Sequence, residues 1–279
     1  MTGVVPFLKA PGPSSQQAVT AVRRLARSRR AGHAGTLDPE AAGLLLVCLG
    51  GATRLAEYLM ERPKSYRALV RFGVSTDTLD AAGLTLRVSQ AKVTPAAVEA
   101  ALPDFIGDIR QTPPAFSAVK QGGRNAYELA RAGQAVALDP RPVHVAAIRL
   151  VGWEEPGGAW LNIDCGSGFY VRALARDLGE AVGCPAYLAA LVRTGCGGFA
   201  VQDAWTLEEL QADGVESAVV PPAAALAFLP AVQLAPGEVV AVRHGMQIAG
   251  LPVRRSRLLD GTGELVAVAA SGRLEKVWS

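Results

Sequence analysis

The amino-acid sequence predicts a mixed α/β (α+β) fold, with one large domain followed by a small β-rich domain. The 279 residues can bury a substantial core, and half of them are hydrophobic while 19% are charged, as in globular proteins. Segments with strand alternation and segments with helical spacing follow one another between residues 3 and 210. The Ala- and Pro-rich stretch Val219–Pro230 then separates them from short apolar runs joined by turns. We therefore expect domains at residues 1–220 and 231–279.

The individual elements follow from local patterns. Strands are expected where apolar residues run together or alternate, at Gly3–Leu8, Gly43–Gly50, Lys64–Gly73, Val145–Val151 and Leu161–Cys165. Helical spacing predicts helices at Ser15–Arg29, Ala52–Met60, Pro95–Leu102 and around Asn125–Arg131. Ser14 and Gln17 form a capping-box pattern at the first of these helices. Near the C-terminus, short strands are expected at Val239–Val240, Leu258–Leu259, 261–269 and Val277–Trp278.

Composition argues against several classes of protein. No apolar run approaches a membrane span and the N-terminus lacks a secretory pattern, so we expect a cytoplasmic protein with no membrane association. The four cysteines, Cys48, Cys165, Cys184 and Cys196, are widely spaced, which indicates buried thiols in place of a zinc site or a disulfide framework. No metal site, P-loop or dinucleotide fingerprint is present, so we expect no cofactor. We expect a monomer.

Residues 30–43, RAGHAGTLDPEAAG, carry the candidate chemistry. Their glycines and proline predict a loop, which contains one imidazole, His33, and one carboxylate, Asp38. Such a loop can hold reactive groups against an anionic substrate. However, Asp38-Pro39-Glu40 is equally typical of a helix start with aspartate as the N-cap, and the local pattern leaves both possibilities open.

Two arginine clusters are candidates for phosphate contacts. The first leads into the Asp38 loop and comprises Arg23, Arg24, Arg27, Arg29 and Arg30, and the second comprises Arg243, Arg254, Arg255 and Arg257. Clusters of this kind are often only solvated surface, and the net charge of +3 is too small to decide between the two interpretations.

The segment GHAGTLDPEAAG resembles the catalytic-aspartate motif of the TruB family of tRNA pseudouridine synthases. Further segments resemble that family in the same order: Lys64–Gly73 with Tyr66, 76–80 with Asp80, Gly166–Gly179 with Tyr170 and Arg172, and Leu191–Thr194. Three departures stand out. Leu8 replaces an aspartate before Lys9, so Lys9 is left out of the predicted site, and Ser167 and Phe169 replace a lysine and a threonine.

The resemblance implies a pseudouridine synthase fold with a mostly antiparallel central sheet and a PUA-like RNA-binding domain at the C-terminus. It implies that uridine 55 in the T-arm stem-loop of tRNA is flipped out and isomerised to pseudouridine. Asp38 would be the nucleophile, and Arg172 the permanently charged partner that keeps it ionised. Whether Asp38 attacks C1′ or C6 stays open.

The resemblance also implies contacts with the RNA. Tyr66 would stack on the target base, Tyr170 and Leu191 would complete the uracil site, and His33 would fill the space that the flipped base leaves. Phosphates would be contacted by Arg30 and, from a mobile loop at about residues 112–142, by Lys120, Arg124 and Arg131.

Plainer interpretations remain for single residues, since Tyr66 could be an ordinary strand aromatic and Arg172 an exposed arginine of an amphipathic helix. Two other functions also remain. One is a non-catalytic RNA-binding module or tRNA-folding chaperone, and the other is an aspartate-dependent nucleoside hydrolase.

Overall fold

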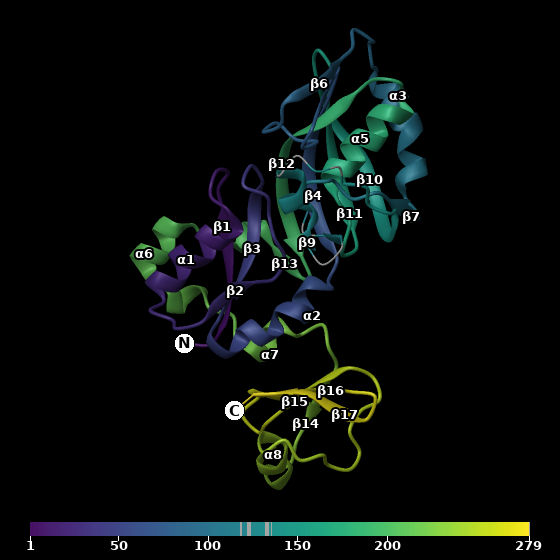
Figure 1. The fold of residues 1–279 in the computed structure, drawn as a ribbon. Coiled ribbons are helices and arrows are strands. Elements are labelled where there is room, and N and C mark those ends of the chain that lie inside the picture. The colour runs from purple at the N-terminus through teal and green to yellow at the C-terminus, as the bar shows by residue number, and fades with distance from the viewer. Residues whose placement is uncertain (118, 122–123, 132–133, 135, 279) are drawn as a thin grey trace.

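The computed structural model describes residues 1–117, 119–121, 124–131, 134 and 136–278, and only the backbone at 120, 121, 124, 125, 130 and 131. These residues form a large sheet with flanking helices and a small C-terminal sheet (Figure 1). The mixed α/β fold with a mostly antiparallel central sheet is therefore confirmed, and a small C-terminal sheet is present. The exact domain boundaries stay a prediction.

The large sheet has the strand order β1-β3-β12-β4-β11-β10-β7, with β2 paired to β3 and β13 paired to β12. The bounds of its strands are β1 (Gly3–Lys9), β2 (Ala31–His33), β3 (Ala42–Leu49), β4 (Lys64–Phe72), β7 (Gly107–Gln111), β10 (Arg141–Glu154), β11 (Gly158–Cys165), β12 (Ala186–Cys196) and β13 (Phe199–Ala200). Among the described strands of this sheet, all pairings except the parallel pair β3–β12 are antiparallel. Strand β12 thus joins the two halves of the sheet.

Separate hairpins and helices accompany the large sheet. The hairpins are β5 (Val74–Thr76) with β6 (Thr85–Val88), and β8 (Lys120–Gln121) with β9 (Arg124–Asn125). The helices are α1 (Ser15–Leu25), α2 (Ala56–Met60), α3 (Pro95–Ala101), α4 (Ala126–Arg131), α5 (Val171–Ala181), α6 (Leu207–Asp213) and α7 (Pro222–Ala225). Helices α3 and α5 share a core with β4, β10, β11 and β12, whereas α1 and α6 share one with β1 and β3 (Figure 1).

The first helix starts as predicted but ends earlier. The Ser14 hydroxyl accepts a hydrogen bond from the Gln17 N–H at 3.2 Å, and the Gln17 side chain accepts one from the Ser14 N–H at 2.8 Å, which confirms the capping box. Arg27 has a φ of +47°, outside the helical region, and α1 ends at Leu25 instead of Arg29. Arg30 consequently follows the helix and does not belong to its last turn.

The C-terminal sheet contains β14 (Ala231–Gln233), β15 (Ser256–Leu259), β16 (Leu265–Ala270) and β17 (Arg273–Val277). The prediction of a strand at Val239–Val240 is wrong, because these residues lie in α8 (Pro236–Arg243). Pro236 suits the first position of a helix, and the Glu238 side chain accepts the Ala235 N–H at 2.8 Å.

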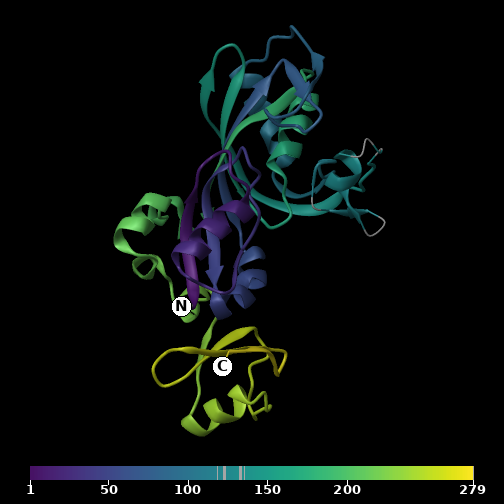
Figure 2. The ribbon, with the colours of Figure 1, turned by 60° about the vertical axis from the view of Figure 1, so that its left-hand side comes forward.

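The small sheet packs against the end of the large domain that carries α2 and α7 (Figures 1 and 2). Leu265, Val268 and Trp278 share a core with Leu55 and Tyr58, and the Trp278 indole N–H donates to the Gly51 carbonyl at 3.0 Å. The two parts are therefore packed together and not only linked.

None of the helices in the described part of the chain is long and apolar enough to cross a membrane. All four cysteines are buried free thiols, as predicted.

Candidate active site

Asp38 lies in a turn between β2 and β3. The Ala41 N–H donates to the Asp38 carbonyl at 3.0 Å, and β3 begins directly afterwards. The alternative that Asp38 caps a helix is therefore wrong. The chain needs a glycine at position 43, the second residue of β3. Its φ is +103°, and a Cβ there would lie 2.7 Å from the backbone nitrogen of Arg193.

Groups from the N-terminal segment fix the backbone around Asp38. The Ser15 hydroxyl accepts the Leu37 N–H and donates to the Leu37 carbonyl, both at 2.8 Å. The Gly12 N–H donates to the Pro39 carbonyl at 2.8 Å. Residues on both sides of Asp38 are thus held in place, which limits the directions in which its carboxylate can point.

Lys9, at the end of β1, holds the backbone beside Asp38 and is absent from the predicted site. Its side chain is fully buried, and Nζ donates to the carbonyls of Ala10 at 3.0 Å, Pro39 at 2.9 Å and Ala41 at 2.6 Å. Burial lowers the pKa of this ammonium group, while the charge of Glu40 opposes that shift. Lys9 needs no aspartate beside it, because its partners are backbone carbonyls. The family resemblance at Lys9, which persists although Leu8 replaces the aspartate before it, was the signal that could have identified it.

Arg172, near the start of α5, reaches the Asp38 carboxylate. Its Nε lies 2.9 Å from Oδ2 of Asp38 and 3.8 Å from Oδ2 of Asp80. Its terminal nitrogens donate to the carbonyls of Thr78 at 3.0 Å and Phe116 at 2.9 Å. Only 9% of the Arg172 side chain is exposed, so it is not the exposed helix arginine of the plainer interpretation. Arg172 therefore faces the Asp38 carboxylate as a cation whose position is fixed by two further hydrogen bonds.

A small hollow opens at this ion pair. Asp38, Glu40, Asp80 and Arg172 line it together with residues 188–191 of β12, which include Leu191. Its lining combines charged groups with aliphatic carbon, and Leu191 contributes part of the aliphatic lining.

Tyr66 and Tyr170 are not among the described residues that line this hollow. Tyr170 lies near the ion pair. Burial raises its pKa, and the charge of Arg172 opposes that shift. Tyr66 lies on β4 opposite Arg193 of β12, and burial raises the pKa of its phenol to about 12. Tyr66 thus carries no charge at neutral pH and packs against the same core cluster as Leu191.

His33 ends β2, where it pairs with Val47 of β3. Its Nδ1 is buried and has no hydrogen-bond partner among the described residues. Burial lowers the pKa of the imidazole, and the charge of Arg193 lowers it further. His33 is therefore neutral at pH 7 and lies close to Arg193.

The structure adds two more residues that the predicted site lacks, Asp80 and Arg193. The Asp80 side chain is 15% exposed and accepts hydrogen bonds from the Thr78 hydroxyl and, at 3.1 Å, from the Ala82 N–H. Its place in the family-like segment 76–80 could have identified it. Arg193 is almost fully buried and donates to carbonyls of the Asp38 loop.

The predicted RNA contacts are placed only in part. Arg30 is exposed at the surface between α1 and β2, and its side chain has no polar partner among the described residues. The backbones of Lys120, Arg124 and Arg131 lie in β8, β9 and α4, but their side chains fall outside what the structure describes. Gly122 and Gly123 lie outside it as well.

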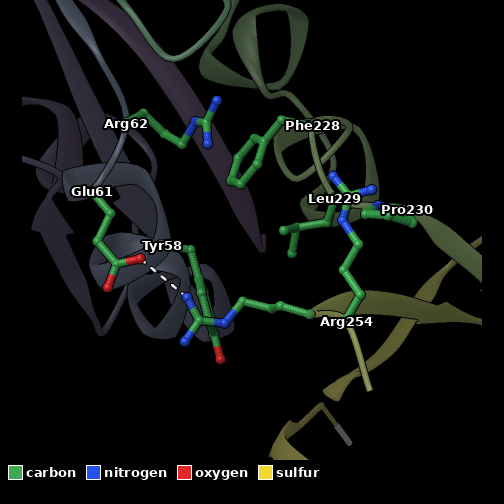
Figure 3. Close-up of a pocket in the computed structure, with 8 residues that line it drawn as sticks. Tyr58, Glu61, Arg62, Phe228, Leu229, Pro230 and Arg254 are labelled. Carbon is green, nitrogen blue, oxygen red and sulfur yellow. Dashed lines mark hydrogen bonds and ion pairs between the residues drawn. The ribbon is translucent and has the colours of Figure 1, made fainter. Parts of the chain in front are cut away.

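A second hollow lies at the junction of the two parts of the chain (Figure 3). In it the Arg62 guanidinium stacks 4.2 Å from the centre of the Phe228 ring, and Arg255 pairs with Glu61 at 3.1 Å. None of the predicted site residues lines it. Asp38, Arg172 and Leu191 line the smaller hollow instead.

The sequence matches two family models. Residues 23–171 match the model described as TruB family pseudouridylate synthase (N terminal domain), and residues 172–221 match that of the tRNA pseudouridylate synthase B C-terminal domain. Asp38 falls within the first match, and Arg172 is the first residue of the second.

Whole relatives and a solved structure agree with these matches. The chain is 43% identical over 272 residues to tRNA pseudouridine synthase B of Thiobacillus denitrificans, covering 96% of this chain and 91% of that protein. It is 45% identical over 248 residues to the protein of the same name from Symbiobacterium thermophilum, covering 88% and 82%. The crystal structure of a Cbf5-Nop10-Gar1 complex is similar with a TM-score of 0.76 at 26% identity, covering 99% of this chain and 84% of that chain.

Proposed function

We propose, from the premise that the chain belongs to the TruB family of pseudouridylate synthases and is an isomerase, that it converts uridine 55 in the T-arm loop of tRNA to pseudouridine. The single observation that carries the proposal is the 2.9 Å pair between Arg172 Nε and Asp38 Oδ2 at the edge of a partly aliphatic hollow.

The reaction needs little beyond these groups. The C1′–N1 bond breaks, a C1′–C5 bond forms, C5 loses a proton and N1 gains one, so the product has the same atoms as the substrate. Asp38 acts as the nucleophile that forms a transient bond to the nucleotide. Arg172 keeps the carboxylate ionised before attack and stabilises it again when it leaves.

The target base must leave the stacked loop before it can enter the hollow. Leu191 then provides apolar contact, and Tyr66, on the strand next to that of Leu191, stacks on the base. The neutral His33 fills the space vacated in the RNA, and Tyr170 closes the site beside Arg172. Arg30 and the segment 112–142, with Lys120, Arg124 and Arg131, contact phosphates.

The C-terminal sheet acts as a PUA-like RNA-binding domain in this proposal. Its arginines contribute unequally, since Arg255 pairs with Glu61 and Glu275, and Arg243 pairs with Asp260. The exposed Arg254 has no polar partner among the described residues and is the best candidate for a phosphate contact.

The test measures pseudouridine formation in an unmodified T-arm stem-loop for the intact protein and for Asp38→Asn, together with the RNA dissociation constant of each. We expect product only from the intact protein and similar binding by both. Asp203→Asn, which changes an exposed aspartate outside the site, is the matched control and should behave like the intact protein.

Two results would contradict the proposal. Tight binding without product from the intact protein would leave a non-catalytic RNA-binding module. Release of free uracil, seen as a loss of mass from the RNA, would indicate a nucleoside hydrolase, since isomerisation leaves the mass unchanged.

A further inference from the structure

Arg193 of β12 is the largest fully buried side chain in the described part of the protein, with 1% of its surface exposed. It takes part in none of the ion pairs among the described residues. A buried charge without a carboxylate partner is unfavourable unless hydrogen bonds compensate for the lost water. The hydrogen bonds of this guanidinium must therefore compensate for its burial.

Three backbone carbonyls of the segment around Asp38 accept hydrogen bonds from Arg193, and the Tyr66 hydroxyl on β4 is a further partner. Nε donates to the carbonyl of Leu44 at 2.7 Å, and the terminal nitrogens donate to those of Gly35 at 3.1 Å and Thr36 at 3.4 Å. Gly35 and Thr36 precede Asp38 in the chain, and Leu44 follows it. One planar guanidinium thus ties both ends of the loop to β12.

The backbone of Arg193 is equally well placed. In the sheet it lies opposite Gly43 of β3 on one side and Tyr66 of β4 on the other. The β3–β12 pairing spans only two residue pairs, so this is the point at which the two halves of the sheet meet. Leu191, two residues earlier on β12, lines the hollow beside Asp38. The same strand therefore carries the loop's anchor and one wall of the hollow.

From this geometry we infer that Arg193 is a positioning residue for the proposed reaction, which sets the direction of the Asp38 carboxylate toward Arg172 and the base by holding the carbonyls of Gly35, Thr36 and Leu44. This inference rests on the proposed function. The arrangement of these carbonyls also explains why an arginine is needed. A guanidinium holds its donors in a fixed planar fork that matches the three separated carbonyls, whereas the ammonium group of a lysine cannot place its donors in that geometry.

Single-turnover rates on the T-arm stem-loop test the inference with Arg193→Lys and Arg193→Ala. A small displacement of a reacting group can lower a rate by about a hundredfold, and we expect a loss of that order for Arg193→Ala. The RNA dissociation constant should change less than threefold. Arg193→Lys keeps the charge and part of the hydrogen bonding, so it should fold and lie between Arg193→Ala and the intact protein.

Chemical rescue distinguishes positioning from general stability. Guanidinium chloride, well below denaturing concentrations, should enter the cavity left by Arg193→Ala and raise the rate several-fold, while an equal concentration of sodium chloride should not. Arg71→Ala is the matched control, because Arg71 lies on β4, pairs with Glu154 and is remote in sequence from the Asp38 loop. It should show neither a rate loss nor a rescue.

Amide hydrogen exchange of residues 35–44 gives a readout that does not depend on turnover. Faster exchange of this segment in Arg193→Ala, with the rest of the sheet unchanged, supports the inference even if the intact protein forms no pseudouridine and the proposed function fails. Unchanged exchange, or rates in both Arg193 variants equal to that of the intact protein, would overturn it. A rate loss without rescue that parallels a fall in thermal stability would overturn it too.

Discussion

Replacing Arg172 by alanine is the sharpest perturbation of the proposed site. The substitution removes the partner of Asp38 at 2.9 Å, the nearby cation of Asp80 at 3.8 Å, and the donors to the carbonyls of Thr78 and Phe116. If the pair holds the nucleophile ionised and aligned, turnover must fall much more than RNA binding.

The size of the effect follows from burial. Removing one partner of a buried ion pair costs about 3–5 kcal/mol. Because 42% of the Asp38 side chain is exposed, water screens part of the interaction. We therefore expect the free energy of unfolding to fall by about 3 kcal/mol. For a chain of this size that corresponds to a lower Tm by roughly 6–12 °C. Misalignment of the carboxylate should lower the rate constant by about a hundredfold or more.

The assay compares Arg172→Ala with Arg176→Ala, four residues later on the same helix. Arg176 pairs with Asp177 at 2.7 Å and donates to the Thr112 carbonyl at 3.0 Å, but it forms no ion pair or hydrogen bond with Asp38 in the described part of the chain. Single-turnover rates, RNA dissociation constants and thermal unfolding are measured for both variants. The reasoning is refuted if Arg172→Ala keeps its rate, or if both variants lose rate and affinity equally.

Three further predictions address the turn, the buried phenol and the RNA surface. Gly43→Ala should destabilise the protein by at least about 2 kcal/mol more than Gly12→Ala. Both glycines have φ above 100°, but only at Gly43 would a Cβ lie 2.7 Å from the backbone nitrogen of Arg193. Equal decreases in Tm for the two variants would contradict this prediction. Burial raises the pKa of Tyr66 to about 12 in the folded state, so its contribution to stability is intact below pH 10 and is lost as the pH rises toward 12. Tyr66→Phe should lessen this alkaline loss of stability and remove one late-titrating phenol from the ultraviolet titration. Arg30→Gln should reduce the slope of log affinity for tRNA against log salt concentration by about 0.7–0.9, whereas the exposed Arg273→Gln should leave it unchanged.

Local patterns were sufficient for elements whose signals lie within a few residues. The Ser14–Gln17 capping box and the alternation in 64–72 are signals of this kind. Strand β12 could not be predicted in the same way, because AYLAALVRTGC is rich in alanine and leucine and has no strand alternation. Its strand conformation comes from pairing with β3 and β4 on either side. Helix α8 was missed for a related reason, since two adjacent valines favour a strand while Pro236 and Glu238 favour a helix start.

The same distinction between local and distant signals holds for the residues of the site. Asp38 was identifiable because its motif is contiguous in sequence, and Arg172 because the Tyr-x-Arg pattern accompanies it. Lys9 bonds carbonyls about thirty residues away, and Arg193 bonds carbonyls about 150 residues away. Contacts between a side chain and a distant backbone carbonyl leave no residue-type signature at the second position. Such anchors become visible only when the chain is folded.

Three buried cations surround the Asp38 loop, Lys9, Arg172 and Arg193, and they bind different groups of it. Lys9 and Arg193 donate to backbone carbonyls on both sides of Asp38, so they can fix where Asp38 lies, but neither forms an ion pair with it among the described residues. Arg172 contacts the Asp38 carboxylate itself, so its removal deletes a charged partner as well as an anchor. Arg172→Ala should therefore lower the single-turnover rate more than Arg193→Lys, which keeps its charge and part of its hydrogen bonding. A comparison of the two rates separates the loss of the ion pair from a change in the position of the loop.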